Sequence, residues 1–171
     1  LVVGLFPHGH AELLAQSAVQ SDAPDVAEAA LDSLAACPVD GPEALTGIVN
    51  SGAPFGVREP ALRFLVPAEG EELEKDRKEL FLDIYRATPP PPGVRLSKKQ
   101  GIVYSHGMRE IAFSALAPTL DQRTLTKATK DDSGEIRLVA LVELDSRPKS
   151  KMKSVAKDIY KRKDNPLKLR V

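Results

Sequence analysis

Residues 21–34 read Ser-Asp-Ala-Pro-Asp-Val-Ala-Glu-Ala-Ala-Leu-Asp-Ser-Leu, and residues 131–144 read Asp-Asp-Ser-Gly-Glu-Ile-Arg-Leu-Val-Ala-Leu-Val-Glu-Leu. Aligned without a gap, the two stretches place Ala30 on Ala140 and Leu34 on Leu144. An internal repeat of this size indicates units that cannot bury their apolar faces alone and must therefore stack on their neighbours. The pattern predicts an elongated stack of helices.

The same template recurs at residues 56–65 and 107–116. Its first apolar position, which we call the anchor, is occupied in the four copies by Val26, Val57, Met108 and Ile136. The steps between successive anchors are 31, 51 and 28 residues, so the period is irregular. We expect the four anchors to lie at equivalent depths in one apolar seam.

A proline follows each copy of the template, at Pro38, Pro67, Pro118 and Pro148. Proline cannot donate the helical hydrogen bond and disfavours the α conformation in the residue before it, so each helix should end there. Polar residues at the other end are suited to cap the free N–H groups of a helix, and these are Asp22, Ser105, Asp132 and Ser133.

Each template helix should be the second member of a pair, because an amphipathic segment precedes it. The predicted first helices span Ala11–Val19, Pro42–Asn50, Glu71–Ala87 and Leu120–Thr129. In the third of these segments, Leu80, Phe81 and Ile84 fall on one face at helical spacing. Alternating strand patterns with hairpin turns are missing from the sequence, which favours an all-α fold.

The chain resembles a run of HEAT repeats over most of residues 10–147. The resemblance is carried by Asp22 to Leu34, and by the arginine and acid that follow the anchor in Val57-Arg58-Glu59 and Met108-Arg109-Glu110. It implies a right-handed α-solenoid of about four helix pairs. Two of the steps are shorter than the usual family period of roughly 40 residues, and an irregular helical bundle is the alternative.

We predict a single HEAT-like repeat domain over residues 1–171, with a loop insertion at 88–105 and a basic segment at 147–171. The insertion contains Pro89-Pro90-Pro91-Pro92, which favours an extended polyproline conformation. With Arg86 it also satisfies Arg-x-x-Pro-x-x-Pro, the pattern of SH3 ligands. The insertion can therefore be interpreted either as a rigid spacer or as a docking motif.

The net charge of zero conceals a gradient along the chain. Residues 1–94 hold six Lys and Arg against fifteen Asp and Glu, whereas residues 147–171 hold ten against two. The basic segment fits a helix with Met152, Val155 and Ile159 on its inner face. The basic residues predicted to bind partners are Arg58, Arg95, Lys98, Lys99, Arg109, Lys151, Lys153, Lys157, Lys161 and Arg162.

The sequence offers little that points to catalysis. It contains neither a phosphate-binding Gly-x-x-x-x-Gly-Lys nor a Gly-x-Ser-x-Gly elbow. His8, His10 and Glu12 could in principle gather on a metal, but a zinc site needs at least three well-placed ligands, and roles in a loop or a helix cap are favoured for these residues. Cys37 is the sole cysteine and is expected to act as a small buried hydrophobe. We therefore predict a protein that is not an enzyme and that needs neither a cofactor nor a metal.

Two hypotheses of function follow. The first is a scaffold or adaptor that binds other proteins of a multi-subunit complex, since stacked helices offer a long surface for docking. The second is a module that binds RNA or DNA through the basic C-terminal segment.

The repeat spacing from Ala11 to Leu65 is similar to that of HEAT scaffolds in nuclear RNA processing, such as symplekin-like proteins, which implies a nuclear or cytoplasmic assembly. The apolar run at residues 1–6 is too short to span a membrane and is interpreted as the end of a preceding repeat helix. We therefore expect a fragment of a longer stack without a membrane segment.

Overall fold

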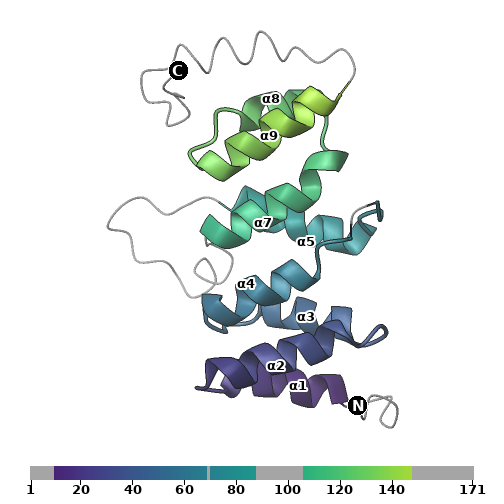
Figure 1. Ribbon diagram of the computed structural model, residues 1–171, viewed down its shortest axis with the longest axis vertical. Coiled ribbons are helices and arrows are strands. Elements are labelled where there is room, and N and C mark those ends of the chain that lie inside the picture. The colour runs from purple at the N-terminus through teal and green to yellow at the C-terminus, as the bar shows by residue number, and fades with distance from the viewer. Residues whose placement is uncertain (1–9, 69, 88–105, 148–171) are drawn as a thin grey trace. The chain divides into compact units, whose positions relative to one another are not determined.

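The computed structural model describes residues 10–68, 70–87 and 106–147 (Figure 1). Every regular element in these ranges is helical, so the prediction of an all-α protein is confirmed for the described residues. The elements are α1 (His10–Gln20), α2 (Pro24–Ala35), α3 (Gly41–Asn50), α4 (Phe55–Phe64), α5 (Lys75–Arg86), α7 (His106–Leu116), the 3₁₀ helix η1 (Ala117–Thr119), α8 (Gln122–Ala128) and α9 (Gly134–Ser146).

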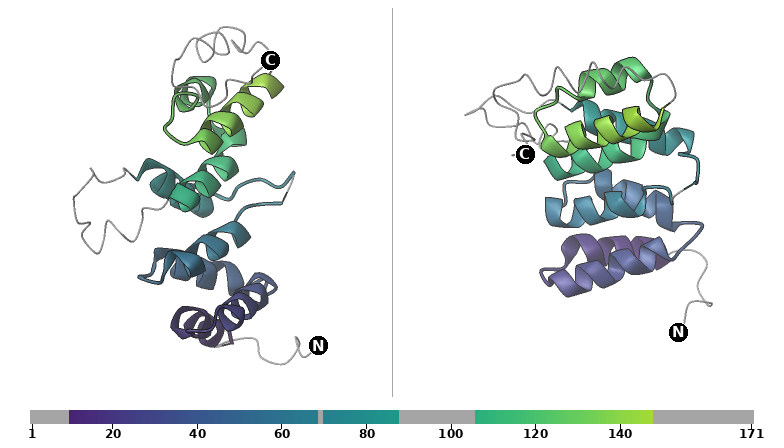
Figure 2. Two further views of the ribbon diagram at one scale, coloured as in Figure 1. Left: turned by 60° about the vertical axis from the view of Figure 1, so that its left-hand side comes forward. Right: turned by 45° about the horizontal axis from the view of Figure 1, so that its top comes forward.

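Tertiary contacts divide the chain into two compact units, with the boundary between Ala112 and Phe113 inside α7. In the first unit, α1 packs on α2 and α3 packs on α4, and further contacts join α2 to α3 and α1 to α3 (Figure 2). In the second unit, α8 packs on α9, and η1 also contacts α9. Three of the four predicted helix pairs are therefore in contact, namely α1 with α2, α3 with α4, and α8 with α9.

Two positions of the template are buried in all four copies. The alanine four residues after the anchor is Ala30, Ala61, Ala112 or Ala140, and the leucine four residues further is Leu34, Leu65, Leu116 or Leu144. None of the eight is more than 5% exposed. Because residues four apart lie on one helix face, this Ala-x-x-x-Leu stripe builds the buried side of every copy.

The prediction that the four anchors lie at equivalent depths is wrong. Met108 and Ile136 are buried at 0% and 1% exposure, whereas Val26 is 48% exposed and Val57 is half-buried. In α2 and α4 the buried face includes the residue after the anchor, Ala27 or Arg58, in place of the anchor itself, while the alanine and leucine of the stripe stay buried.

Only some of the predicted N-cap residues cap a helix in the structure. The Ser133 hydroxyl caps α9 by accepting from the Ile136 N–H at 3.2 Å, which confirms that prediction. Asp22 does not cap α2, because Ala23 occupies the N-cap position. Asp132 likewise lies outside the cap position of α9, while Ser105 and Pro148 are outside the described residues.

The third predicted first helix starts later than expected. We predicted a start at Glu71, but α5 begins at Lys75. Gly70 has a φ of +88°, which is a left-handed conformation suited to glycine. The Glu71 carboxylate also accepts from the Ala68 N–H at 3.2 Å, and the Glu71 N–H donates to the Ala68 carbonyl at 3.0 Å. These bonds close a turn that delays the helix.

Candidate interaction surface

Arg58 of α4, predicted to bind a partner, is buried and contacts backbone within the fold. Its side chain is 2% exposed, and its Nε donates to the Val49 carbonyl at 2.8 Å. That carbonyl lies in the last turn of α3, where carbonyls have no intrahelical partner. The guanidinium also lies 5.2 Å from the ring centre of Phe55. Burial lowers the pKa of Arg58, although an arginine stays charged at neutral pH.

The equivalent arginines of the next two copies also bind backbone. Arg109 of α7 is half-buried, donates from Nε to the Tyr85 carbonyl at 3.2 Å, and lies 5.4 Å from the Tyr85 ring centre. Arg137 of α9 donates from Nη1 to the carbonyls of Asp131 and Asp132, at 2.7 and 3.0 Å. In three copies, therefore, the arginine after the anchor holds the end of the preceding helix or the turn that follows it.

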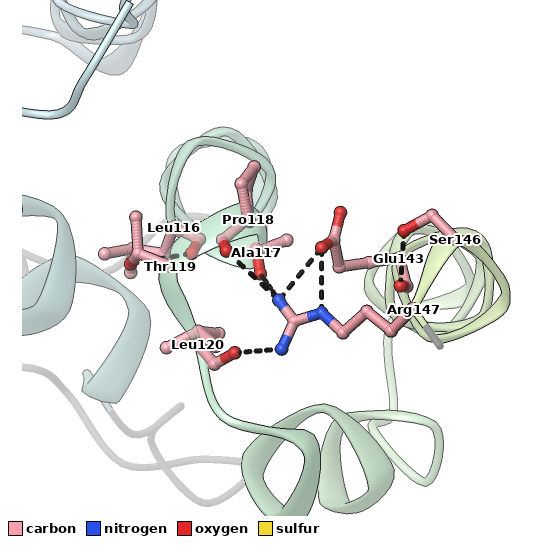
Figure 3. Close-up of polar contacts among 8 residues, drawn as sticks. All are labelled: Leu116, Ala117, Pro118, Thr119, Leu120, Glu143, Ser146 and Arg147. Atoms are coloured by element: carbon pink, nitrogen blue, oxygen red, sulfur yellow. Dashed lines mark hydrogen bonds and ion pairs between the residues drawn. The ribbon is translucent and has the colours of Figure 1, made fainter. Parts of the chain in front are cut away.

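Arg147 also binds backbone carbonyls, as Figure 3 shows. The sequence did not predict this role, because Arg147 was counted with the basic segment. Its Nη1 donates to the Leu120 carbonyl, and its Nη2 donates to the carbonyls of Ala117 and Pro118 at 3.0 and 3.1 Å. Its Nε and Nη2 also bind the Glu143 carboxylate, at 3.0 and 2.9 Å. Arg147 therefore ties the end of α9 to η1.

The remaining predicted partner-binding residues lie outside the described residues and stay predictions, and these are Arg95, Lys98, Lys99, Lys151, Lys153, Lys157, Lys161 and Arg162. His8 lies outside as well. In the ranges that the structure describes, no three His, Cys, Asp or Glu side chains gather as metal ligands. The same ranges hold no helix with both the length and the apolar character needed to cross a bilayer.

A groove of about 620 Å³ runs between α1 and α3. Small and apolar side chains from both helices form its floor, namely Ala11, Ala15, Val19, Ala44 and Ile48, and Gly47 opens one wall. Its rim carries three acidic residues, Glu12, Asp40 and Glu43, together with Gln16, Gln20 and Ser51. In the sequence, the signal for this groove is the recurrence of alanine and glycine at helical spacing. We interpreted these two segments only as amphipathic helices.

The stretch of the chain that contains this groove is acidic. Residues 1–57 contain seven Asp and Glu and no Lys or Arg, so the formal charge of this stretch is −7. The seven acids are Glu12, Asp22, Asp25, Glu28, Asp32, Asp40 and Glu43, and each is exposed or half-buried. A negative surface of this kind attracts cationic partners and accelerates their association.

The second unit presents a basic face of its own. Arg123, Lys127 and Lys130 of α8 and its C-terminal turn are exposed and line a shallow pocket of about 430 Å³. Thr124 and Thr126 complete its lining. The spacing of three and four residues places the three cations on one side of the helix. This face is suited to an anionic partner.

No family model, curated protein or solved structure matches this chain. The resemblance to HEAT repeats therefore depends on the template residues themselves. Among the described residues, the features that bear on function are the acidic groove between α1 and α3 and the basic face of α8.

Proposed function

We propose that this chain is a non-catalytic scaffold or adaptor that binds other proteins of a larger assembly. Its architecture would be a right-handed α-solenoid of about four HEAT-like helix pairs. The observation that carries the proposal is the Ala-x-x-x-Leu stripe, which is buried at the same template positions in all four copies. Repeats that bury one seam leave their remaining faces to partners.

The contacts of the template arginines with backbone support the same proposal. Arg58 and Arg109 donate to backbone carbonyls at the ends of preceding helices, so they stabilise the pairs. Binding then falls to surfaces that the fold leaves open, such as the groove between α1 and α3. The similarity in spacing to symplekin-like scaffolds favours an assembly in the nucleus or cytoplasm, with RNA processing as the context.

The alternative function is nucleic-acid binding, which two charge observations favour. Arg123, Lys127 and Lys130 form a basic face on α8, and residues 147–171 carry ten Lys and Arg against two Asp and Glu. Phosphate contacts release counterions, so the affinity of such a module falls steeply as salt rises.

Cross-linking of the full chain in cells, followed by affinity purification with and without nuclease, tests the proposal. A scaffold retains a defined set of proteins in near-stoichiometric amounts after the nucleic acid has been digested. Loss of all partners after digestion, together with a steep salt dependence of binding to purified RNA or duplex DNA, would instead establish the alternative.

A further inference from the structure

The groove between α1 and α3 is lined by two short helices. The helices α1 and α3 have 11 and 10 residues, which at a rise of about 1.5 Å per residue makes each roughly 15 Å long. A floor of alanine, valine and isoleucine between two helices of this length can receive the apolar face of a third helix. The occupant would bury two or three turns.

Gly47 is the residue that keeps the groove open. It lies in the interior of α3, where glycine weakens a helix relative to alanine. A Cβ built at Gly47 meets nothing within 4 Å, and the residue has no positive φ, so neither close packing nor backbone conformation calls for glycine here. What glycine does at this position is leave space in the groove wall.

The rim of the groove sets the charge of the occupant. Glu12 lies on α1 and Glu43 on α3, so the groove has an acidic side chain on each wall. The nearest Lys or Arg in sequence is Arg58, whose guanidinium is turned inward to Val49. An apolar floor between acidic walls is complementary to a helix with one apolar face flanked by Lys and Arg.

We propose that this groove docks a cationic amphipathic helix of a partner protein. The inference rests on the proposed scaffold function and names the chemistry of one partner. The apolar side chains of the occupant would lie on Ala15, Ala44 and Ile48, while its cations would meet Glu12 and Glu43.

A labelled peptide tests this proposal directly. The probe is a fluorescein-labelled peptide of leucine and lysine, about 14 residues long, with leucines every three or four residues, and fluorescence anisotropy measures its binding to the full chain. A scrambled peptide without amphipathic spacing and a peptide with glutamate in place of lysine should both bind at least tenfold more weakly. Equal binding of the ordered and scrambled peptides would overturn the proposal.

Two pairs of variants localise the binding. The double variant Glu12→Lys/Glu43→Lys should weaken binding at least tenfold, whereas Asp25→Lys/Glu28→Lys, with the same change of charge at exposed sites outside the groove, should weaken it far less. Gly47→Leu fills the groove and should weaken binding tenfold, while Gly56→Leu adds the same side chain at an exposed glycine of α4 where a Cβ also meets nothing. Circular dichroism checks that each variant is folded.

The possible outcomes separate this inference from the scaffold function. Equal losses in both charge variants would mean non-specific attraction and would overturn the groove assignment. A gain in affinity when Lys151, Lys153 and Lys157 become Gln would show that the chain's own basic segment competes for the groove, which would also overturn the assignment to a partner. If Glu12→Lys/Glu43→Lys retains every cross-linked protein, the groove inference fails while the scaffold proposal stands.

Discussion

Single arginines hold the helices of this protein together. Arg58 donates to a carbonyl in the last turn of α3, and Arg147 donates to three carbonyls around η1. A guanidinium has five N–H donors in a planar fork, so it can satisfy several carbonyls that a helix end leaves free. These charges therefore contribute to stability by binding backbone within the fold.

Replacing Arg58 with alanine tests this structural role. The substitution removes the donor to Val49 and leaves a buried carbonyl without its partner, so we expect the free energy of unfolding to fall by about 1–3 kcal/mol. Urea unfolding measures the change. Arg63→Ala, at an exposed position of the same helix, should stay within about 0.5 kcal/mol of the wild type. Equal stability of the two variants would contradict the role of Arg58.

Two leucines that the template treats as equivalent should differ in their effect. Leu31 is 2% exposed, whereas Leu141, which aligns with it in α9, is half-buried. We expect Leu31→Ala to lower the free energy of unfolding by about 2–5 kcal/mol, because it leaves a cavity in a packed core. Leu141→Ala should cost clearly less. Chemical denaturation of both variants checks the order, and a larger loss at Leu141 would refute the burial assignment.

At the scale of single residues, the sequence predicts the core better than the surface. Ala30, Leu34 and their counterparts stand at aligned positions of the template and are all buried, because apolar residues four apart on a helix have few alternatives to burial. Arg58 is misread, because a charged side chain is normally exposed. Its spacing of three residues from the buried Ala61 is the signal that would have placed it on the inner face.

Helix α3 shows how two glycines of one element serve different purposes. At Gly41, a Cβ would approach the Leu34 carbonyl oxygen to 2.1 Å and the Cys37 Cβ to 3.2 Å, so the α2–α3 turn has no room for a side chain. At Gly47 the same atom would meet nothing within 4 Å. The first glycine serves packing and the second leaves the groove open.

The two corresponding alanine variants should therefore change stability in opposite directions. Gly41→Ala forces backbone apart and should cost about 1–3 kcal/mol, whereas Gly47→Ala should add roughly 0.5–1 kcal/mol because alanine favours the helix. The urea midpoints of the two variants provide the measurement. A destabilised Gly47→Ala would show that this glycine has a structural role that the contacts around it do not reveal.

The N-cap of α8 should respond to pH. The Asp121 carboxylate accepts from the Thr124 N–H at 2.7 Å, and this bond is the main reason why the pKa of Asp121 is lowered from 3.8. A lowered folded-state pKa means that the stabilisation is complete above the unfolded-state value and is lost as the pH falls through the folded-state value.

Comparison of the wild type with Asp121→Asn across pH 2–7 tests this cap. The difference in free energy of unfolding should be constant at neutral pH and should shrink as the pH falls below the ordinary carboxyl range. Urea unfolding at each pH provides the data. A difference that does not change with pH would mean that the charged carboxylate contributes nothing to the cap.

At the scale of elements, the sequence predicts that the described helices exist but not where each one starts. The segment preceding each template helix is helical as expected, since its apolar residues recur at helical spacing. The start of α5 was misplaced because the turn around Gly70 depends on bonds between Ala68 and Glu71, which composition alone does not specify. The groove was not predicted because it forms only where α1 packs against α3, and the sequence does not show which first helices are in contact.

Over the whole chain, we infer a stack in which each helix pair is stabilised mainly by its neighbours. Stability in such a stack is local, and a defect in one pair leaves distant pairs folded. A single cooperative core would instead spread any defect over all helices. If stability is local, a chain should divide into compact units, and this chain divides into one unit up to Ala112 and one from Phe113.

Hydrogen exchange measured by mass spectrometry on Leu34→Ala and Leu144→Ala tests whether stability is local. Both leucines are at most 1% exposed, one in α2 and the other in α9. We predict that Leu34→Ala accelerates amide exchange in α1 to α4 and leaves α8 and α9 unchanged, and that Leu144→Ala does the reverse. Acceleration of exchange in all described helices by either substitution would contradict the stack and favour an irregular bundle with one core.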